Sequence, residues 1–378
     1  MNTLWQEKKL GEVCEFKYGK NLPDGTRVAG PYPVFGSSSQ VSFHKDFHVE
    51  GPGIIVGRKG TVGKVQYTKS NFFPIDTTFY VEVKDKNTSD MKFLYYRLGL
   101  CGLSEMNSDA AVPGLNRNAA LSLKVMLPPL QTQQKIAKIL SAYDDLIEIN
   151  QNRIILLEEM ARITYEEWFV RMRFHGHESS PAIPETGLPE GWGNQNINVL
   201  YRIKYGNNLP QTAISDSGKY PVYGAAGVMG YYHESNANKK IALITSRGNG
   251  SADVHRTYEA AFVTNNSFLV LPNKGFEHLE LAFTINLLKL AGLKSFCSGA
   301  AQPQLTNDAL KGLKVILPNK PIIEAYNRTV MPAYEAADNL RVQNQYLREA
   351  RDILLPRLMT GIIDAESYGP IHSIKESA

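Results

Sequence analysis

The chain has 378 residues, more than one hydrophobic core usually supports, so we expect two or three domains. Hydrophobic residues make up 43% of the sequence and charged residues 21%, proportions that exclude a wholly disordered chain. The 41 Lys and Arg residues against 37 Asp and Glu give a formal charge of +4. That charge permits a local basic face but does not by itself indicate nucleic-acid binding.

The three cysteines, Cys14, Cys101 and Cys297, are too few and too far apart for a disulfide framework or a CxxC zinc motif. The first residues lack the apolar core of a secretion signal, and no uncharged apolar run of about 18 residues occurs. These features predict a cytoplasmic protein that does not associate with a membrane.

Five short blocks occur twice in the same order, which is the most informative feature of the sequence. The pairs are KYGKNLP (17–23) and KYGNNLP (204–210), YPVFG (32–36) and YPVYG (220–224), VGRKGTVGKV (56–65) and TSRGNGSADV (245–254), PIDTTFYVEV (74–83) and VTNNSFLVLP (263–272), and AVPGLNRNAALSLKVMLP (111–128) and AQPQLTNDALKGLKVILP (301–318). The third pair aligns Arg58 with Arg247. The separation of the copies changes only from about 187 to about 190 residues, which indicates a tandem duplication of a domain-sized unit.

Each copy begins with a β-rich part, residues 1–129 and 192–319. Short apolar runs such as GIIVG, TTFYVEV and SFLVL alternate there with Gly, Pro and Asn, a pattern that predicts compact mixed α/β domains. A linker rich in Pro, Gly and Ser, residues 176–191, separates the copies, and residues 363–378 form a tail.

A helical segment follows each β-rich part, at residues 130–175 and 320–362. Apolar residues recur there at alternating gaps of four and three, which is typical of a coiled-coil seam. Pro332 lies inside the second segment, and we expect it to kink that helix or delay its start. The predicted seam consists of Ile136, Leu140, Ile147, Asn150, Ile154, Leu157, Leu340, Asn344, Leu347 and Leu354.

The predicted fold class is therefore α+β, with two duplicated domains that are each followed by a long helix. Because each helix is too long for one small domain to cover, we expect the two helices to pair as an antiparallel coiled coil. That pairing would place the β-rich domains at opposite ends. The polar seam residues Asn150 and Asn344 are of the type that fixes helix register.

The sequence offers no convincing catalytic or metal site. The segment GRKGTVGKV (57–65) has the wrong spacing for a phosphate-binding loop, and Val65 replaces the Ser or Thr that would bind Mg²⁺. His44 and His48 are interpreted as surface histidines rather than metal ligands. No hydrolase, zinc-protease or dinucleotide motif occurs.

Loops in both copies combine glycine with basic and amide side chains next to aromatic residues. Arg and Lys neutralise phosphates, Arg also binds guanine, and Asn and Gln bind adenine. The glycines are equally well explained as turn residues. The framework recurs while the loop residues differ, as expected for two scaffolds that recognise two sequences. The residues predicted to contact DNA are Lys17, Lys20, Asn21, Arg58, Lys59, Asn116, Arg117, Lys204, Asn207, Asn208, Arg247, Asn249, Gln302 and Gln304.

In order, duplication and spacing, these motifs resemble a specificity subunit of a type I restriction-modification system over essentially the whole chain. LPPLQTQQKIAKILSAYDDLIEINQNRIILLEEM (127–160) resembles the central helical region of that family, and ILLPRLMTGIID its distal helical region. YPVFG, GRKGTVGKV and FFPIDTTFYV resemble its first target-recognition domain.

The resemblance implies that each target-recognition domain binds one half of a bipartite, asymmetric DNA sequence, and that the helices set the gap between the halves. It implies docking of two methyltransferase subunits and, through them, of restriction and translocase subunits. The chain itself would be non-catalytic and bind no cofactor, whereas S-adenosylmethionine, ATP and Mg²⁺ would bind to the partner subunits.

Two alternatives remain open at this point. The chain could be the specificity component of another multi-subunit modification system. It could also be a coiled-coil scaffold whose β-rich domains bind protein or carbohydrate, in which case it would lack salt-dependent affinity for DNA. A catalytic function is the least favoured interpretation.

Overall fold

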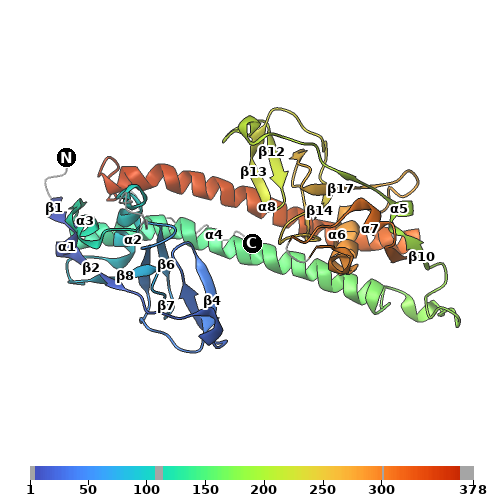
Figure 1. Cartoon of the computed structure of the whole chain (residues 1–378), viewed down its shortest axis with the longest axis horizontal. Helices are drawn as coiled ribbons and strands as arrows, with labels where there is room; N and C mark the ends of the chain where they lie inside the picture. The colour runs from blue at the N-terminus through green and yellow to red at the C-terminus, as the bar shows by residue number, and fades with distance from the viewer. Residues whose placement is uncertain (1–4, 107–113, 300–301, 367–378) are drawn as a thin grey trace, which may run out of the picture. The chain divides into compact units, whose positions relative to one another are not determined.

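The computed structural model describes residues 5–106, 114–299 and 302–366. By packing, the chain divides into two compact units. The first unit consists of Met1–Ile149 and Asn344–Ala378, and the second of Asn150–Gln343. Each unit contains one β-rich domain and a part of each long helix, labelled α4 and α8 in Figure 1.

The β-rich domain of the first unit has, within its described residues, three small sheets. Their strand orders are β1-β9, β2-β8-β5-β6 and β4-β3-β7. Strand β5 is buried along its whole length because β8 and β6 pair with its edges and both of its faces are packed. Ile54 and Val56 belong to the main core, and Ile55 packs with Phe35 and Phe72. The elements are β1 (Gln6–Lys9), α1 (Leu10–Val13), β2 (Cys14–Tyr18), η1 (Asp24–Thr26), β3 (Tyr32–Phe35), β4 (Gln40–His44), β5 (Gly53–Gly57), β6 (Val65–Thr68), β7 (Phe73–Pro74), β8 (Thr78–Val83), α2 (Met91–Gly99), η2 (Leu103–Glu105), α3 (Arg117–Ser122) and β9 (Lys124–Leu127).

The β-rich domain of the second unit repeats this arrangement strand by strand. Its sheets have the orders β10-β18, β11-β17-β14-β15 and β13-β12-β16. The elements are β10 (Gly193–Asn196), α5 (Ile197–Leu200), β11 (Tyr201–Tyr205), η5 (Gln211–Ala213), β12 (Tyr220–Gly224), β13 (Gly227–Tyr232), β14 (Ala242–Thr245), β15 (Val254–Arg256), β16 (Phe262–Val263), β17 (Ser267–Pro272), α6 (Leu281–Leu290), η6 (Leu293–Phe296), α7 (Asn307–Leu310) and β18 (Lys314–Leu317). The predicted duplication of a mixed α/β domain is confirmed.

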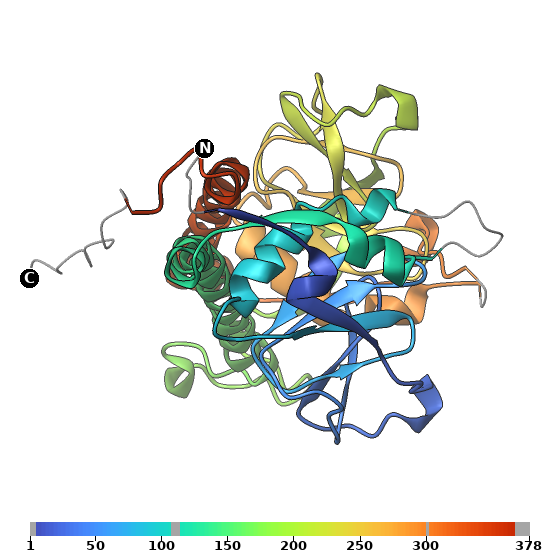
Figure 2. The same cartoon turned by 90° about the vertical axis from the view of Figure 1, so that its left-hand side faces the viewer.

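The long helices are α4 (Leu130–Tyr165), which ends in a π-helical turn, η3 (Glu166–Val170), and α8 (Lys320–Met359). Figures 1 and 2 show them as neighbours. In the first unit, Asn344 Nδ2 donates to the Ile147 carbonyl at 3.2 Å, and Arg351 Nη1 lies 2.6 Å from Asp144 Oδ1. Residue numbers rise along one helix as they fall along the other, so the predicted antiparallel pairing is confirmed.

The helices contribute to the core of the domain that each unit contains. In the first unit, Phe16 and Phe79 of the sheet belong to the same buried cluster as Leu140 of α4. In the second unit, Tyr326 of α8 is fully buried, and its hydroxyl donates to the Ala161 carbonyl of α4 at 3.0 Å. Burial of these apolar side chains therefore stabilises domain and helices together.

Six of the ten predicted seam residues are buried and four are half-buried. Ile136, Leu140, Ile147, Asn150, Ile154 and Asn344 are buried, and Leu157, Leu340, Leu347 and Leu354 are half-buried. Arg351 lies between Leu347 and Leu354 at the same helical spacing, and its ion pair with Asp144 of α4 compensates its charge.

Two expectations are wrong, namely a start of α8 delayed by Pro332 and a surface position of His44. Helix α8 already begins at Lys320 and continues through Pro332, so the proline does not delay its start. Pro332 has no N–H, so the carbonyl of Arg328 loses its helical hydrogen-bond partner. Both residues are exposed, so water can hydrate that carbonyl. His44 is not a surface histidine, because it is buried and its Nδ1 accepts a hydrogen bond from the Val28 N–H at 3.1 Å.

Candidate nucleic-acid interface

Four loop segments meet at one end of the four-stranded sheet of the first unit. Tyr18 at the end of β2 pairs with Phe79 near the start of β8, and Gly57 at the end of β5 pairs with Thr78. The segment before α3 joins them, because the Leu115 N–H donates to the carbonyl of the residue after Gly57 at 2.9 Å. The fold thus brings together the predicted residues Lys17, Lys20, Arg58, Lys59, Asn116 and Arg117 from distant parts of the sequence.

Tyr18 is the aromatic centre of this loop cluster. Its side chain is 53% exposed, and its ring packs against Phe79 with a centroid distance of 5.0 Å. The guanidinium carbons of Arg58 and Arg117 lie 5.3 and 5.8 Å from the Tyr18 ring centroid, within cation–π range. Sequence reasoning did not select Tyr18, although the repeated KYG motif contains it.

Arg58 is held by one edge of its guanidinium. Its Nε and Nη2 donate to the carbonyl oxygen of Asp76 at 3.1 and 2.7 Å. Within the described residues, no acceptor binds Nη1, so the edge formed by Nη1 and the second Nη2 hydrogen stays open to a ligand. A fork of this kind matches the two acceptors of a guanine edge or of a phosphate.

Lys17 and Arg117 share the carboxylate of Glu15. Lys17 Nζ lies 3.1 Å from Glu15 Oε2, and Arg117 Nη2 lies 2.7 Å from Glu15 Oε1. The hydrogen bond from Lys17 lowers the pKa of the Glu15 carboxyl, and the same contact raises the pKa of Lys17. The Glu15 carboxylate therefore balances part of the positive charge of Lys17 and Arg117. Arg58 and the exposed Lys59 keep their full positive charge.

Asn116, Lys20 and Asn21 complete the predicted set in this domain. Asn116 Oδ1 accepts from the Ala119 N–H at 3.1 Å and caps α3, so its amide hydrogens are the main groups that it offers to a ligand. Lys20 and Asn21 are exposed in the segment after β2, where Lys20 forms a backbone bridge with Ile75.

The second unit contains an equivalent loop cluster. Its exposed predicted residues are Lys204, Asn207, Asn208, Arg247, Asn249 and Gln302, whereas Gln304 is half-buried. Tyr205 takes the place of Tyr18, with its ring 4.3 Å from that of Phe268 and 36% of the side chain exposed. The Gly248 N–H donates to the Pro303 carbonyl at 3.1 Å, which joins the loop after β14 to the segment before α7.

Backbone hydrogen bonds identify which loop residues of the two domains are equivalent. The Leu115 N–H donates to the carbonyl of Arg58, and the Leu305 N–H donates to the carbonyl of Ser246, both at 2.9 Å. Since Leu115 and Leu305 are counterparts in the duplicated blocks, Ser246 occupies the position of Arg58. The sequence alignment of Arg58 with Arg247 is wrong by one residue.

The structural counterpart of Arg247 is Lys59. Lys59 forms an antiparallel bridge with Gly114, and Arg247 forms the same bridge with Gln304. Both side chains are exposed. A positive charge therefore recurs at one equivalent position of the two loop clusters. The residues at that position are Lys59 and Arg247, not Arg58 and Arg247.

Gly19 and Gly206 show why glycine recurs in the KYG motif. A Cβ atom on Gly19 would lie 2.1 Å from the Ile75 carbonyl oxygen, and one on Gly206 would lie 2.3 Å from the Thr264 carbonyl oxygen. At these two positions glycine is required by close backbone packing within the domain.

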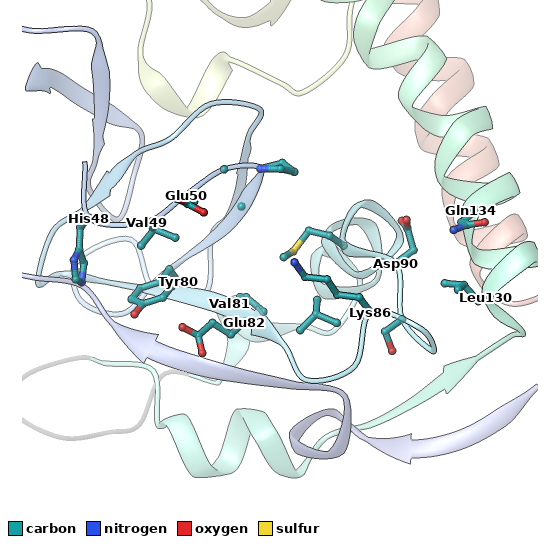
Figure 3. A pocket seen from close by; sticks show the side chains of 16 residues that line it. His48, Val49, Glu50, Tyr80, Val81, Glu82, Lys86, Asp90, Leu130 and Gln134 are labelled. Carbon is teal, nitrogen blue, oxygen red and sulfur yellow. The ribbon is translucent and has the colours of Figure 1, made fainter. Parts of the chain in front are cut away.

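A cavity of about 720 Å³ lies elsewhere in the first unit, near the end of β8 remote from Tyr18 (Figure 3). Among its three carboxylates, Asp90 Oδ1 accepts from the Phe93 N–H at 2.8 Å and caps α2, and Glu82 forms an exposed ion pair with Lys17 at 3.7 Å. Burial lowers the pKa of His48, which also lines the cavity.

Across the described residues, no group of three His, Cys, Asp or Glu side chains is placed to hold a metal ion. None of the described helices is long and apolar enough to cross a membrane.

Two tandem mixed α/β domains, each with a basic and aromatic loop cluster and each followed by a helix of an antiparallel pair, define a two-domain recognition protein. The family described as "Type I restriction modification DNA specificity domain" matches residues 2–159 and 189–325. The chain belongs to this family, whose specificity subunits are in general non-catalytic.

Individual relatives agree with this assignment. The type I restriction enzyme MjaIX specificity subunit of Methanocaldococcus jannaschii is 23% identical over 339 residues, which cover 83% of this chain and 78% of that subunit. A putative type I specificity subunit of Mycoplasma pneumoniae is 20% identical, covering 86% of this chain and 88% of the relative. The crystal structure of the type I restriction-modification S subunit from M. genitalium has the same fold, with a TM-score of 0.61 at 19% identity over 95% of this chain and 97% of that one.

Proposed function

We propose that the chain recognises a bipartite, asymmetric DNA sequence, with one half bound by each β-rich domain. The observation that carries this proposal is the pair of equivalent loop clusters, which share a tyrosine and a basic residue but differ in the side chains between them. Shared basic residues fit the phosphate backbone, which is common to all DNA, and differing residues fit two different sets of base edges.

The α4–α8 pair sets the gap between the two half-sites in this proposal. Seam residues at regular helical spacing are suited to a stiff spacer whose length is fixed by the number of turns.

Methyltransferase subunits dock on the chain, and restriction and translocase subunits join through them. In the second unit, α4 exposes the apolar side chains Ile155 (63%), Leu156 (67%), Met160 (47%) and Ile163 (47%), which supports a protein partner there. S-adenosylmethionine, ATP and Mg²⁺ bind to these partners, and the complex acts in the cytoplasm, where it meets DNA.

Long-read methylation mapping tests this function. The full chain is expressed together with the methyltransferase subunits of its system in a host that lacks their modification, and the control culture omits only this chain. We expect a two-part methylated motif with a fixed gap that appears only when the chain is present. Unchanged methylation despite a purified soluble complex would contradict the proposal and favour a scaffold function.

Binding of duplex DNA to the same complex provides an independent test against the scaffold alternative. Phosphate contacts predict that affinity falls steeply as salt is raised, because bound counterions are released from the DNA. A complex without salt-dependent affinity for DNA would contradict recognition by these domains.

A further inference from the structure

We propose that Arg58 reads a guanine in the half-site of the first domain, whereas Lys59 and Arg247 hold phosphates of the two half-sites. This division of roles rests on the proposed function and adds to it the base and the residue that reads it.

Loop equivalence separates the shared residues Lys59 and Arg247 from Arg58. Lys59 and Arg247 occupy the same bridged position, are both exposed and are both positively charged. Two domains that bind different sequences still meet the same phosphate backbone, so contacts with phosphate are expected at shared positions. Arg58 corresponds instead to the small, buried Ser246, so this position differs between the domains as a base-reading position should.

The fold does not need an arginine at the position of Arg58. The Ser246 hydroxyl donates to the carbonyl of Asn265 at 3.4 Å, and Asn265 is the counterpart of Asp76 in the duplicated blocks. Arg58 donates to the Asp76 carbonyl itself. A serine therefore performs the same anchoring task in the second domain, and the length and charge of Arg58 exceed what that task requires.

The guanidinium of Arg58 is held by a carbonyl and by two aromatic rings. The carbonyl of Asp76 occupies the edge formed by Nε and Nη2, and the Tyr18 and Phe79 rings lie 5.3 and 6.0 Å from Cζ. These contacts fix the plane of the group before DNA arrives and leave the edge between its two terminal nitrogens open. Two parallel N–H donors on that edge match O6 and N7 of guanine.

The test compares variants of the full chain within the methyltransferase complex, once the wild-type motif has been mapped. Arg58→Ser copies the residue of the second domain and keeps an anchor for the loop, and Arg58→Lys keeps the charge but loses the fork. For both variants we expect one G·C position of the first half-site to become tolerant of other pairs. Discrimination against a substituted pair should fall roughly 5- to 100-fold, while the second half-site stays unchanged.

Lys59→Ala and Arg247→Ala are expected to act differently. Each should weaken binding to all DNA sequences alike, leave the methylated motif unchanged and make the dependence of affinity on salt shallower by about one phosphate contact. Lys86→Ala, which removes one exposed charge beyond the far end of β8, serves as the control for a general loss of positive charge.

Two results would overturn the assignment. One is an unchanged motif in a folded Arg58→Ser or Arg58→Lys complex, and the other is a motif altered by Lys59→Ala or Arg247→Ala. Absence of any chain-dependent motif in the wild-type complex would instead overturn the proposed function, and this inference with it, so the two failures are distinguishable.

Discussion

Arg256 and Asp338 form a bidentate ion pair inside the second unit. Arg256 Nη2 lies 2.8 Å from Asp338 Oδ1, and Arg256 Nη1 lies 3.1 Å from Asp338 Oδ2. Arg256 ends β15 and Asp338 lies in the middle of α8, so the pair joins the sheet to the helix that follows its own domain. Lys69, just after the equivalent strand β6, plays the same part in the first unit by pairing with Asp145 and Glu148 of α4.

Asp338→Asn is predicted to destabilise the second unit strongly. The Arg256 side chain is only 4% exposed, and without the Asp338 carboxylate its remaining acidic partner is Glu158 at 3.5 Å, so the buried charge is only partly compensated. Breaking a buried pair in this way costs about 3–5 kcal/mol in the free energy of unfolding. Urea denaturation of the full chain measures the change, with Glu335→Gln on the exposed side of α8 as the control. Equal stability of the two variants would show that the pair contributes little.

Lys69→Ala is predicted to have a much smaller effect, although its ion pairs look similar in distance. Lys69 Nζ lies 2.7 Å from Glu148 and 2.9 Å from Asp145, but the Lys69 side chain is 62% exposed. Solvent screens such pairs, so we expect a loss of about 0–1 kcal/mol. The same urea experiment checks this value, and a loss as large as that of Asp338→Asn would contradict the argument from exposure.

His255 is predicted to make the stability of the second unit depend on pH. Burial lowers the pKa of its imidazole, a hydrogen bond with the Asp253 backbone opposes that shift, and Nε2 is buried without a partner among the described residues. Between the lowered pKa and the ordinary value of about 6.5, the unfolded chain binds more protons than the folded chain. Stability therefore falls as the pH drops below about 6.5, and His255→Gln should reduce that fall.

Urea midpoints at about pH 7.5 and about pH 5.5 measure this dependence. His233→Gln is the matched control, because the His233 side chain is 73% exposed. If His255→Gln and His233→Gln change the pH dependence equally, the buried imidazole is not its source.

Much of the architecture could be predicted from the sequence because it depends on regular patterns. The duplication is visible in recurring blocks, and alternating gaps of four and three predict the paired helices. The expectation that Pro332 delays the start of α8 failed because the rule for proline in helices does not consider whether the freed carbonyl is exposed. His44 failed because no local pattern shows that the Val28 N–H needs its imidazole as an acceptor.

The site was predicted less completely, because loop equivalence depends on backbone hydrogen bonds. The alignment matched Arg58 with Arg247 by residue identity, but the loop of the second domain is one residue longer: Ala252 bonds to Thr245 there, as Gly63 bonds to Gly57 in the first domain. Tyr18 was not selected because its role depends on the rings and guanidinium groups that the fold assembles around it.

The spacer function predicts what a longer helix pair would do. Asn344 donates to the Ile147 carbonyl, so an insertion between Leu146 and Ile147 of α4 is matched by an insertion between Asn344 and Gln345 of α8. Seven residues in each helix preserve the seam and lengthen the pair by about 10 Å, or about three base pairs of DNA. Methylation mapping should then show both half-sites unchanged and the gap longer by about three base pairs. An insertion in α4 alone misaligns the seam and is expected to abolish methylation, whereas altered half-sites with the original gap would contradict the spacer function.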